Sequence, residues 1–130
     1  MKRIVAPEYI LGTNQNLVSK LATIKDAAEI ARCVRDPEVS HALKYFSFFQ
    51  KTPTIEEEAR YLERMIVSKN DRLWAIRSEQ NDEFIGTVGF HEIDAFNDNL
   101  RIGIIIFNKR FLGQGYGRKV MNVMLHIAFE

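Results

Sequence analysis

The stretch NKRFLGQGYGRK occupies residues 108–119, between the most apolar strand-like run of the chain and its most apolar helix-like run. Gly113, Gly115 and Gly117 alternate in it, so successive backbone N–H groups can point into one concavity without intervening Cβ atoms. The first N–H groups of the following helix have no acceptor within the helix and add to the same site. The stretch is therefore interpreted as a loop that binds phosphate.

Cationic side chains flank this loop on both sides. Lys109 and Arg110 precede the glycines, and Arg118 and Lys119 follow them. Lysine and arginine both pair with phosphate, so the pattern favours a ligand that carries several phosphate charges. The same glycines would also suit a tight turn without a ligand, so the rest of the chain must decide the role of the loop.

Two other phosphate-binding motifs do not fit. No Gly-Lys-Ser/Thr follows a glycine at the Walker A spacing. The dinucleotide-binding spacing G-x-G-x-x-G fails because the third glycine comes one residue early, and the sequence ends before an acidic ribose ligand could appear about twenty residues on. A nucleotide-binding regulator that uses this loop is therefore the least favoured function.

Apolar periodicity predicts the elements around the loop. Residues 102–107 are almost all β-branched or aromatic and precede the glycines, which predicts a buried strand. Thr54 and Glu57 have capping-box spacing, and the acidic residues 56–58 suit the dipole of a first helical turn without a metal ion. Residues 1–16 are expected to be an extended lead-in, and the aromatic-rich residues 43–49 have no clear period. We predict strands at 17–21, 73–76, 84–90 and 102–107. A first helix is expected to start at the capping-box-like residues 23–26, to bury Ala27, Ile30, Ala31 and Val34, and to stop at Asp36-Pro37, where a short turn of another helix is expected to follow. Further helices are expected from 54 to about 70, with an apolar stripe of Ile55, Ala59, Leu62 and Ile66, and after the loop.

The loop resembles motif A of the GNAT acetyltransferases, whose consensus is Q/R-x-x-G-x-G/A. Arg110-x-x-Gly113-x-Gly115 matches every letter. Leu112-x-x-Gly115-x-Gly117 has leucine where the family prefers Gln or Arg, but it reproduces the common G-x-G-Y-G spelling just before the helix. We prefer the second register.

The resemblance extends over residues 17–130 and is similar to the branch of ribosomal-protein N-terminal acetyltransferases. It implies an α/β (α+β) fold of the GNAT type, with a mixed, mostly antiparallel sheet flanked by helices, in one domain of residues 1–130 that stops after the third main helix. The further matching segments are residues 17–26, 36–39, the Thr54 cap, Ile85-Gly86 with Gly89, and residues 92–94 before Asn97.

The resemblance also implies the ligand and its contacts. Acetyl-CoA is the expected cosubstrate, with no metal ion. Main-chain groups of Ile105, Ile106 and Phe107 are expected to pair with the pantetheine arm and the acetyl carbonyl. The pyrophosphate is expected to bind at Leu112, Gly113, Gln114, Gly115, Tyr116, Gly117 and Arg118, with the Tyr116 ring serving packing.

The catalytic groups cannot be assigned from the sequence. Many relatives have a glutamate two residues before the glycine of the fourth strand, and here that position is Arg101. His91 and Glu92 are the nearest substitutes, but we expect a solvated histidine at the end of a strand. His126 shares a polar stripe with Arg118 and Asn122 that solvent exposure explains.

Composition bounds the class of protein. At 130 residues with 46% hydrophobic and 27% charged residues, the chain suits one globular domain and lacks the apolar run of a membrane span or signal peptide, so a cytoplasmic location is expected. The net charge of +1 argues against nucleic-acid binding. Cys33 is interpreted as a packed small hydrophobe.

We expect an N-acetyltransferase that acts on a primary amine, with a protein N-terminal α-amine as the acceptor. The alternative is a non-catalytic CoA-binding or protein-interaction module. The strand at 102–107 would be an apolar sheet edge, which suggests a further C-terminal segment, a second copy of the chain or a partner subunit as its cover. Because catalysis needs the other wall of that groove, these residues alone are expected to bind CoA without turnover.

Overall fold

The computed structural model describes residues 9–11, 16–43 and 54–128. The aromatic-rich segment singled out in the sequence lies almost entirely outside these residues. The described elements are β1 Tyr9–Leu11, β2 Asn16–Leu21, α1 Asp26–Val34, α2 Pro37–Leu43, α3 Ile55–Val67, β3 Arg72–Ser78, β4 Phe84–Asp94, β5 Asn99–Ile106, the 3-10 turn η2 Lys109–Phe111 and α4 Tyr116–Ala128.

The strands form one sheet in chain order, β1-β2-β3-β4-β5, and every pair is antiparallel. This confirms the predicted meander of three strands before the glycine loop. The antiparallel pairing of the described strands agrees with the expected mostly antiparallel sheet. The lead-in prediction missed β1, because its three residues lack a pattern of their own and are ordered by pairing with β2.

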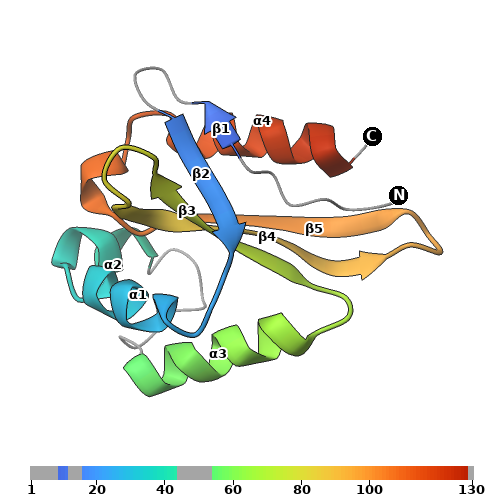
Figure 1. Ribbon diagram of the computed structural model, residues 1–130, viewed down its shortest axis with the longest axis horizontal. Helices are drawn as coiled ribbons and strands as arrows, with labels where there is room; N and C mark the ends of the chain where they lie inside the picture. Colours follow the sequence, from blue (N-terminus) through green and yellow to red (C-terminus); the bar gives the residue numbers. More distant parts are fainter. Residues whose placement is uncertain (1–8, 12–15, 44–53, 129–130) are drawn as a thin grey trace.

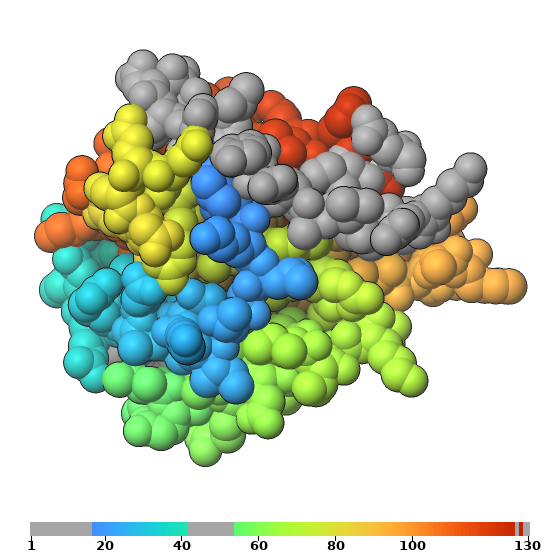
Figure 2. Space-filling view, viewed as in Figure 1, coloured from blue at the N-terminus to red at the C-terminus, as the bar shows by residue number. Residues whose placement is uncertain are grey.

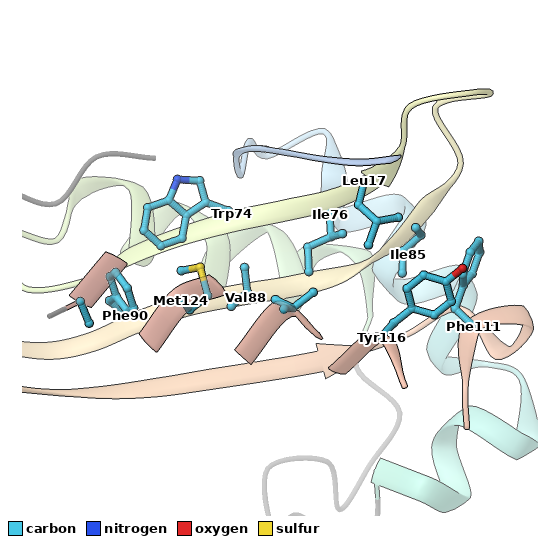
Figure 3. Packing of buried hydrophobic residues seen from close by; sticks show 11 residues of the cluster. Leu17, Trp74, Ile76, Ile85, Val88, Phe90, Phe111, Tyr116 and Met124 are labelled. Carbon is cyan, nitrogen blue, oxygen red and sulfur yellow. The ribbon is translucent and has the colours of Figure 1, made fainter. Parts of the chain in front are cut away.

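Helices cover both faces of the sheet. In Figure 1, α4 lies on one face, whereas α1, α2 and α3 lie on the other. Figure 3 shows the core on the α4 face, where sheet residues such as Trp74 and Val88 meet Met124. The core on the opposite face includes Ile30 of α1 and Leu62 of α3.

The predicted helix starts are confirmed in unequal measure. At α3, Glu57 N donates to Thr54 Oγ1 at 3.1 Å and Thr54 N donates to Glu57 Oε1 at 3.2 Å, which completes the capping box. At α1, Thr23 N donates to Asp26 Oδ2 at 2.8 Å, one of the two bonds of such a box. The four α1 residues expected to be buried are all buried.

The buried face of α3 is rotated from the predicted stripe. Leu62 is fully buried, but Ile55 and Ile66 are 42% and 51% exposed. Glu58 is instead buried, and Met65 packs against the core. The apolar period located the helix correctly, while the contact with α1 decides which side turns inward.

A partly buried ionic cluster joins β3 to α1. Arg77 Nη2 contacts Asp26 Oδ1 at 2.6 Å and also pairs with Glu29. The two carboxylates hold the pKa of the Arg77 guanidinium well above its ordinary value, with the bond to Glu29 as the largest cause. This cluster fixes α1 against the sheet.

The long hairpin of β4 and β5 extends past the other strands. Its turn protrudes at the right edge of Figure 2, and Phe96 in that turn is 95% exposed. The glycine loop lies at the opposite end of β5. Among the described residues, no helix is both long enough and apolar enough to cross a membrane.

Candidate functional site

The glycine loop connects β5 to α4 through the turn η2. Gly113 and Gly115 have φ angles of +71° and +82°, in the left-handed region that glycine adopts without strain. Gly117 lies in the first turn of α4. A Cβ built on any of the three glycines would meet no atom within 4 Å, so the surface of the loop is open.

Polar side chains anchor this loop to the turn between β3 and β4. Asn108 Nδ2 donates to Glu83 Oε2 at 3.0 Å and to the carbonyl oxygen of Phe84 at 2.8 Å. Asn108 Oδ1 accepts from the backbone of Arg110 at 3.1 Å. The sequence analysis missed this anchor, although an Asn at the start of a turn is a known local signal.

The flanking cations divide into two groups. Lys109 Nζ pairs with Asp36 Oδ2 at 3.0 Å, and Arg110 Nη1 pairs with Glu83 Oε1 at 2.7 Å. These two cations therefore position the loop against its neighbours. Arg118 is exposed on α4, and the ammonium of Lys119 lies 5.9 Å from the centroid of the Tyr116 ring.

Aromatic packing supports the start of α4 from beneath. Tyr116 and Phe111 are buried, with ring centroids 5.2 Å apart in an edge-on arrangement. This agrees with the expectation that the Tyr116 ring serves packing. The backbone of the loop consequently rests on a hydrophobic base while its glycines face outward.

The backbone of β5 offers alternating groups at its outer edge. Phe107 N donates to Ile85 O at 2.9 Å, so residues 103, 105 and 107 direct their backbone groups toward β4. Ile104 and Ile106 direct theirs the other way, where no described strand pairs with β5. Of the three residues expected to contact pantetheine, Ile106 has the suitable backbone orientation, and the Phe107 N–H is already engaged.

The prediction of a solvated His91 was wrong. β4 continues to Asp94, and His91 is buried within it at 8% exposure. Its Nδ1 lies 3.2 Å from Asp71 Oδ1. Glu92 and Arg101 are exposed and pair at 3.5 Å between Arg101 Nε and Glu92 Oε2, so Arg101 supplies no base.

Glu58 of α3 and Cys33 of α1 are titratable side chains with raised pKa values. Burial, reinforced by the charge of Glu57, raises the pKa of the Glu58 carboxyl from its ordinary 4.5 to about 7. The sequence analysis explained the acidic residues of this turn by the helix dipole alone, and it did not predict that Glu58 would be buried. Burial also raises the pKa of the Cys33 thiol, which fits a packing role.

Other candidate sites give little chemistry. The described part of the chain contains no group of three or more His, Cys, Asp or Glu that could hold a metal ion. Arg118, Asn122 and His126 are all exposed on α4, as the polar stripe predicted.

Comparison with known proteins decides the family. Residues 17–130 match the family described as Acetyltransferase (GNAT) domain. The chain belongs to the GNAT acetyltransferase family. No curated protein sequence is significantly similar to this GNAT chain.

Solved structures share the fold at low sequence identity. The Vibrio cholerae spermidine N-acetyltransferase in complex with CoA and spermine has a TM-score of 0.69 and 19% identity, over 87% of this chain and 63% of that one. The RimL ribosomal L7/L12 alpha-N-protein acetyltransferase in complex with coenzyme A has a TM-score of 0.73 and 19% identity, over 92% and 67%. An acetyltransferase from Thermus thermophilus has a TM-score of 0.67 and 21% identity, over 91% and 70%. The GNAT chain thus spans less than two thirds of the length of the spermidine enzyme.

Proposed function

We propose that this GNAT chain binds acetyl-CoA and transfers its acetyl group to a primary amine, with a protein N-terminal α-amine as the acceptor. The observation that carries the proposal is the open surface at Gly113, Gly115 and Gly117, where an added Cβ would meet no atom within 4 Å. Backbone N–H groups at such a loop and at the start of α4 suit a pyrophosphate.

The proposed ligand lies along the outer edge of β5 and turns into the loop. Ile104 and Ile106 direct their N–H and C=O groups to that edge, where an amide-bearing arm such as pantetheine can pair with them. Backbone amides at 112–118 then bind the pyrophosphate, and Arg118 adds charge. When bound, acetyl-CoA supplies an activated thioester, and the chain supplies alignment.

The choice of an α-amine rests on the energy of deprotonation. Freeing a lysine amine with a pKa of about 10.4 at pH 7 costs roughly 4–5 kcal/mol, whereas an α-amine with a pKa of about 7.7–8 costs about 1 kcal/mol. Arg101 stands where many relatives carry a glutamate, and the α-amine is the acceptor that needs the least help from any other base. The similarity to RimL supports this acceptor, whereas the similarity to the spermidine enzyme supports a polyamine.

Titration calorimetry with CoA tests the binding site. Gly115→Val places a side chain on the open surface and Gly117→Glu places a negative charge beside the phosphates, so both variants are expected to lose binding. Asn122→Glu is the matched control, because it adds the same charge to an exposed position of α4. CoA binding that survives both glycine substitutions would refute the site, and a preference for ATP or GTP would favour a nucleotide-binding regulator.

A second experiment tests the acceptor. The chain is first extended by a family-like C-terminal half, because these residues alone are expected to bind CoA without turnover. Thiol release from acetyl-CoA is then measured with N-terminal peptides, with the same peptides acetylated at their α-amine but carrying an internal lysine, and with spermine. We expect the free N-terminal peptides to react fastest. A faster reaction with spermine would reject the α-amine, and CoA binding without thiol release from any amine would favour the non-catalytic module.

A further inference from the structure

His91 and Asp71 form a pair that holds one imidazole nitrogen and leaves the other facing the sheet. Asp71 Oδ1 lies 3.2 Å from His91 Nδ1 and accepts from the backbone of Glu92 at 3.3 Å. Asp71 Oδ2 accepts from Ser68 Oγ at 2.5 Å. These bonds, with that of Ser68 the strongest influence, lower the pKa of Asp71. Because a carboxylate only accepts, the tautomer of the neutral ring that this contact favours has its hydrogen on Nδ1 and its lone pair on Nε2.

Two strand glycines make room for the ring. Gly89 and Gly103 are direct partners on β4 and β5. A Cβ on Gly89 would lie 2.7 Å from His91 Nε2, and a Cβ on Gly103 would lie 3.4 Å from the same atom. The imidazole therefore lies over this glycine pair, with Nε2 beside Gly89 of β4 and within van der Waals distance of the Cβ position of Gly103 on β5.

The backbone of β4 bends directly after His91. The register of β4 and β5 shifts between His91 and Asp94, and Glu92 has a φ of +53°. Such a conformation is uncommon for a residue other than glycine, and bulges of this kind often redirect a side chain beside a site. The bond from Glu92 N to Asp71 stabilises the bend and the histidine together.

The position of Nε2 can be compared with the expected position of the acetyl group. Neighbouring strands lie about 4.8 Å apart, so a ligand along the outer edge of β5 lies about one strand spacing beyond Gly103. Gly103 contributes no side chain to that path. An amine that approaches the thioester over this face is within reach of Nε2 through one water.

We propose that His91 is the general base for amine acetylation and that Asp71 is the residue that positions it. This inference rests on the proposed acetyl transfer. The amine nitrogen forms a bond to the acetyl carbon, and the carbon–sulfur bond breaks with its electron pair on sulfur. The amine proton passes to His91 Nε2 through one water, and then through solvent to the CoA thiolate.

Substitutions at the pair separate a base from a packing residue. His91→Asn keeps a donor for Asp71 but removes Nε2, so kcat for thiol release with an N-terminal peptide is expected to fall about 100-fold or more. Its Kd for CoA is expected to stay within about twofold, because the general base contributes to the reacting centre and not to pyrophosphate binding. Asp71→Asn is expected to lower kcat, and a higher peptide concentration is not expected to restore the rate. His126→Asn, at an exposed position of α4, is the control.

Chemical rescue gives a readout that packing alone would not move. His91→Ala leaves a space over the two glycines, and added imidazole is expected to restore turnover in proportion to its concentration. A kcat of His91→Asn within threefold of a working wild type, or the absence of imidazole rescue, would overturn the assignment of His91 while leaving acetyl transfer intact. All turnover measurements use the chain extended by a family-like C-terminal half, because these residues alone are expected to bind CoA without turnover. An extended wild-type chain that binds acetyl-CoA but releases no thiol would refute the proposed function and this assignment together.

Discussion

The buried carboxyl of Glu58 predicts how the stability of the fold depends on pH. Its pKa is raised from 4.5 to about 7 in the folded chain, so the folded state retains a proton that the unfolded state loses. A raised carboxyl pKa stabilises the folded state at low pH, and that stability is lost as pH rises between these two values. Between pH 5 and pH 8 the effect is at most about 2.5 kcal/mol, and about 1–2 kcal/mol after solvent screening.

Urea unfolding of wild type and Glu58→Gln at pH 5 and pH 8 measures this effect. Glu58→Gln cannot titrate, so its free energy of unfolding relative to wild type should rise by about 1–2 kcal/mol between the two values of pH. Glu56→Gln in the same helical turn is the matched control, because it makes the same substitution at an exposed position. The reasoning is refuted if the Glu58→Gln difference is the same at both values of pH.

Three other substitutions test the packing that positions the site. Thr54→Ala removes the side-chain cap of α3 and should lower the free energy of unfolding by about 1 kcal/mol, as measured by thermal unfolding. Gly86→Ala would place a Cβ 2.1 Å from the backbone oxygen of Ile105, so we expect loss of folded protein on expression, and a stable variant would contradict the strand spacing. Arg77→Met leaves Asp26 and Glu29 without their cation, which should lower the free energy of unfolding by about 1.5–3 kcal/mol, as measured by urea unfolding.

The glycine loop was predictable because its signal is local. Alternating glycines after a β-branched run require a particular backbone, and Gly113 and Gly115 have the positive φ angles that this spelling indicates. The helix caps and the meander were predictable for the same reason. The flanking cations were harder, because the partners of Lys109 and Arg110 come from distant parts of the chain.

The histidine pair was not predictable from a linear pattern. His91 is buried because β4 continues past Phe90 and bends, and because Asp71 approaches from the end of α3. The available signal was the spacing Gly89-x-His91, since a glycine inside a strand often marks the close approach of another group. The burial of Glu58 was missed because the apolar period of α3 locates the helix but not its buried face. The neighbouring helix determines which face is buried.

Helix stability and ligand binding favour different residues at position 117. It lies in the first turn of α4 without a positive φ, so alanine there would favour the helix by up to about 1 kcal/mol. The same methyl group would occupy the open surface on which the proposed pyrophosphate rests. Selection for thermal stability alone should therefore enrich alanine at this position, whereas selection for CoA binding should remove it. The residue found at position 117 in a selected population of variants therefore indicates whether the population was selected for stability or for CoA binding.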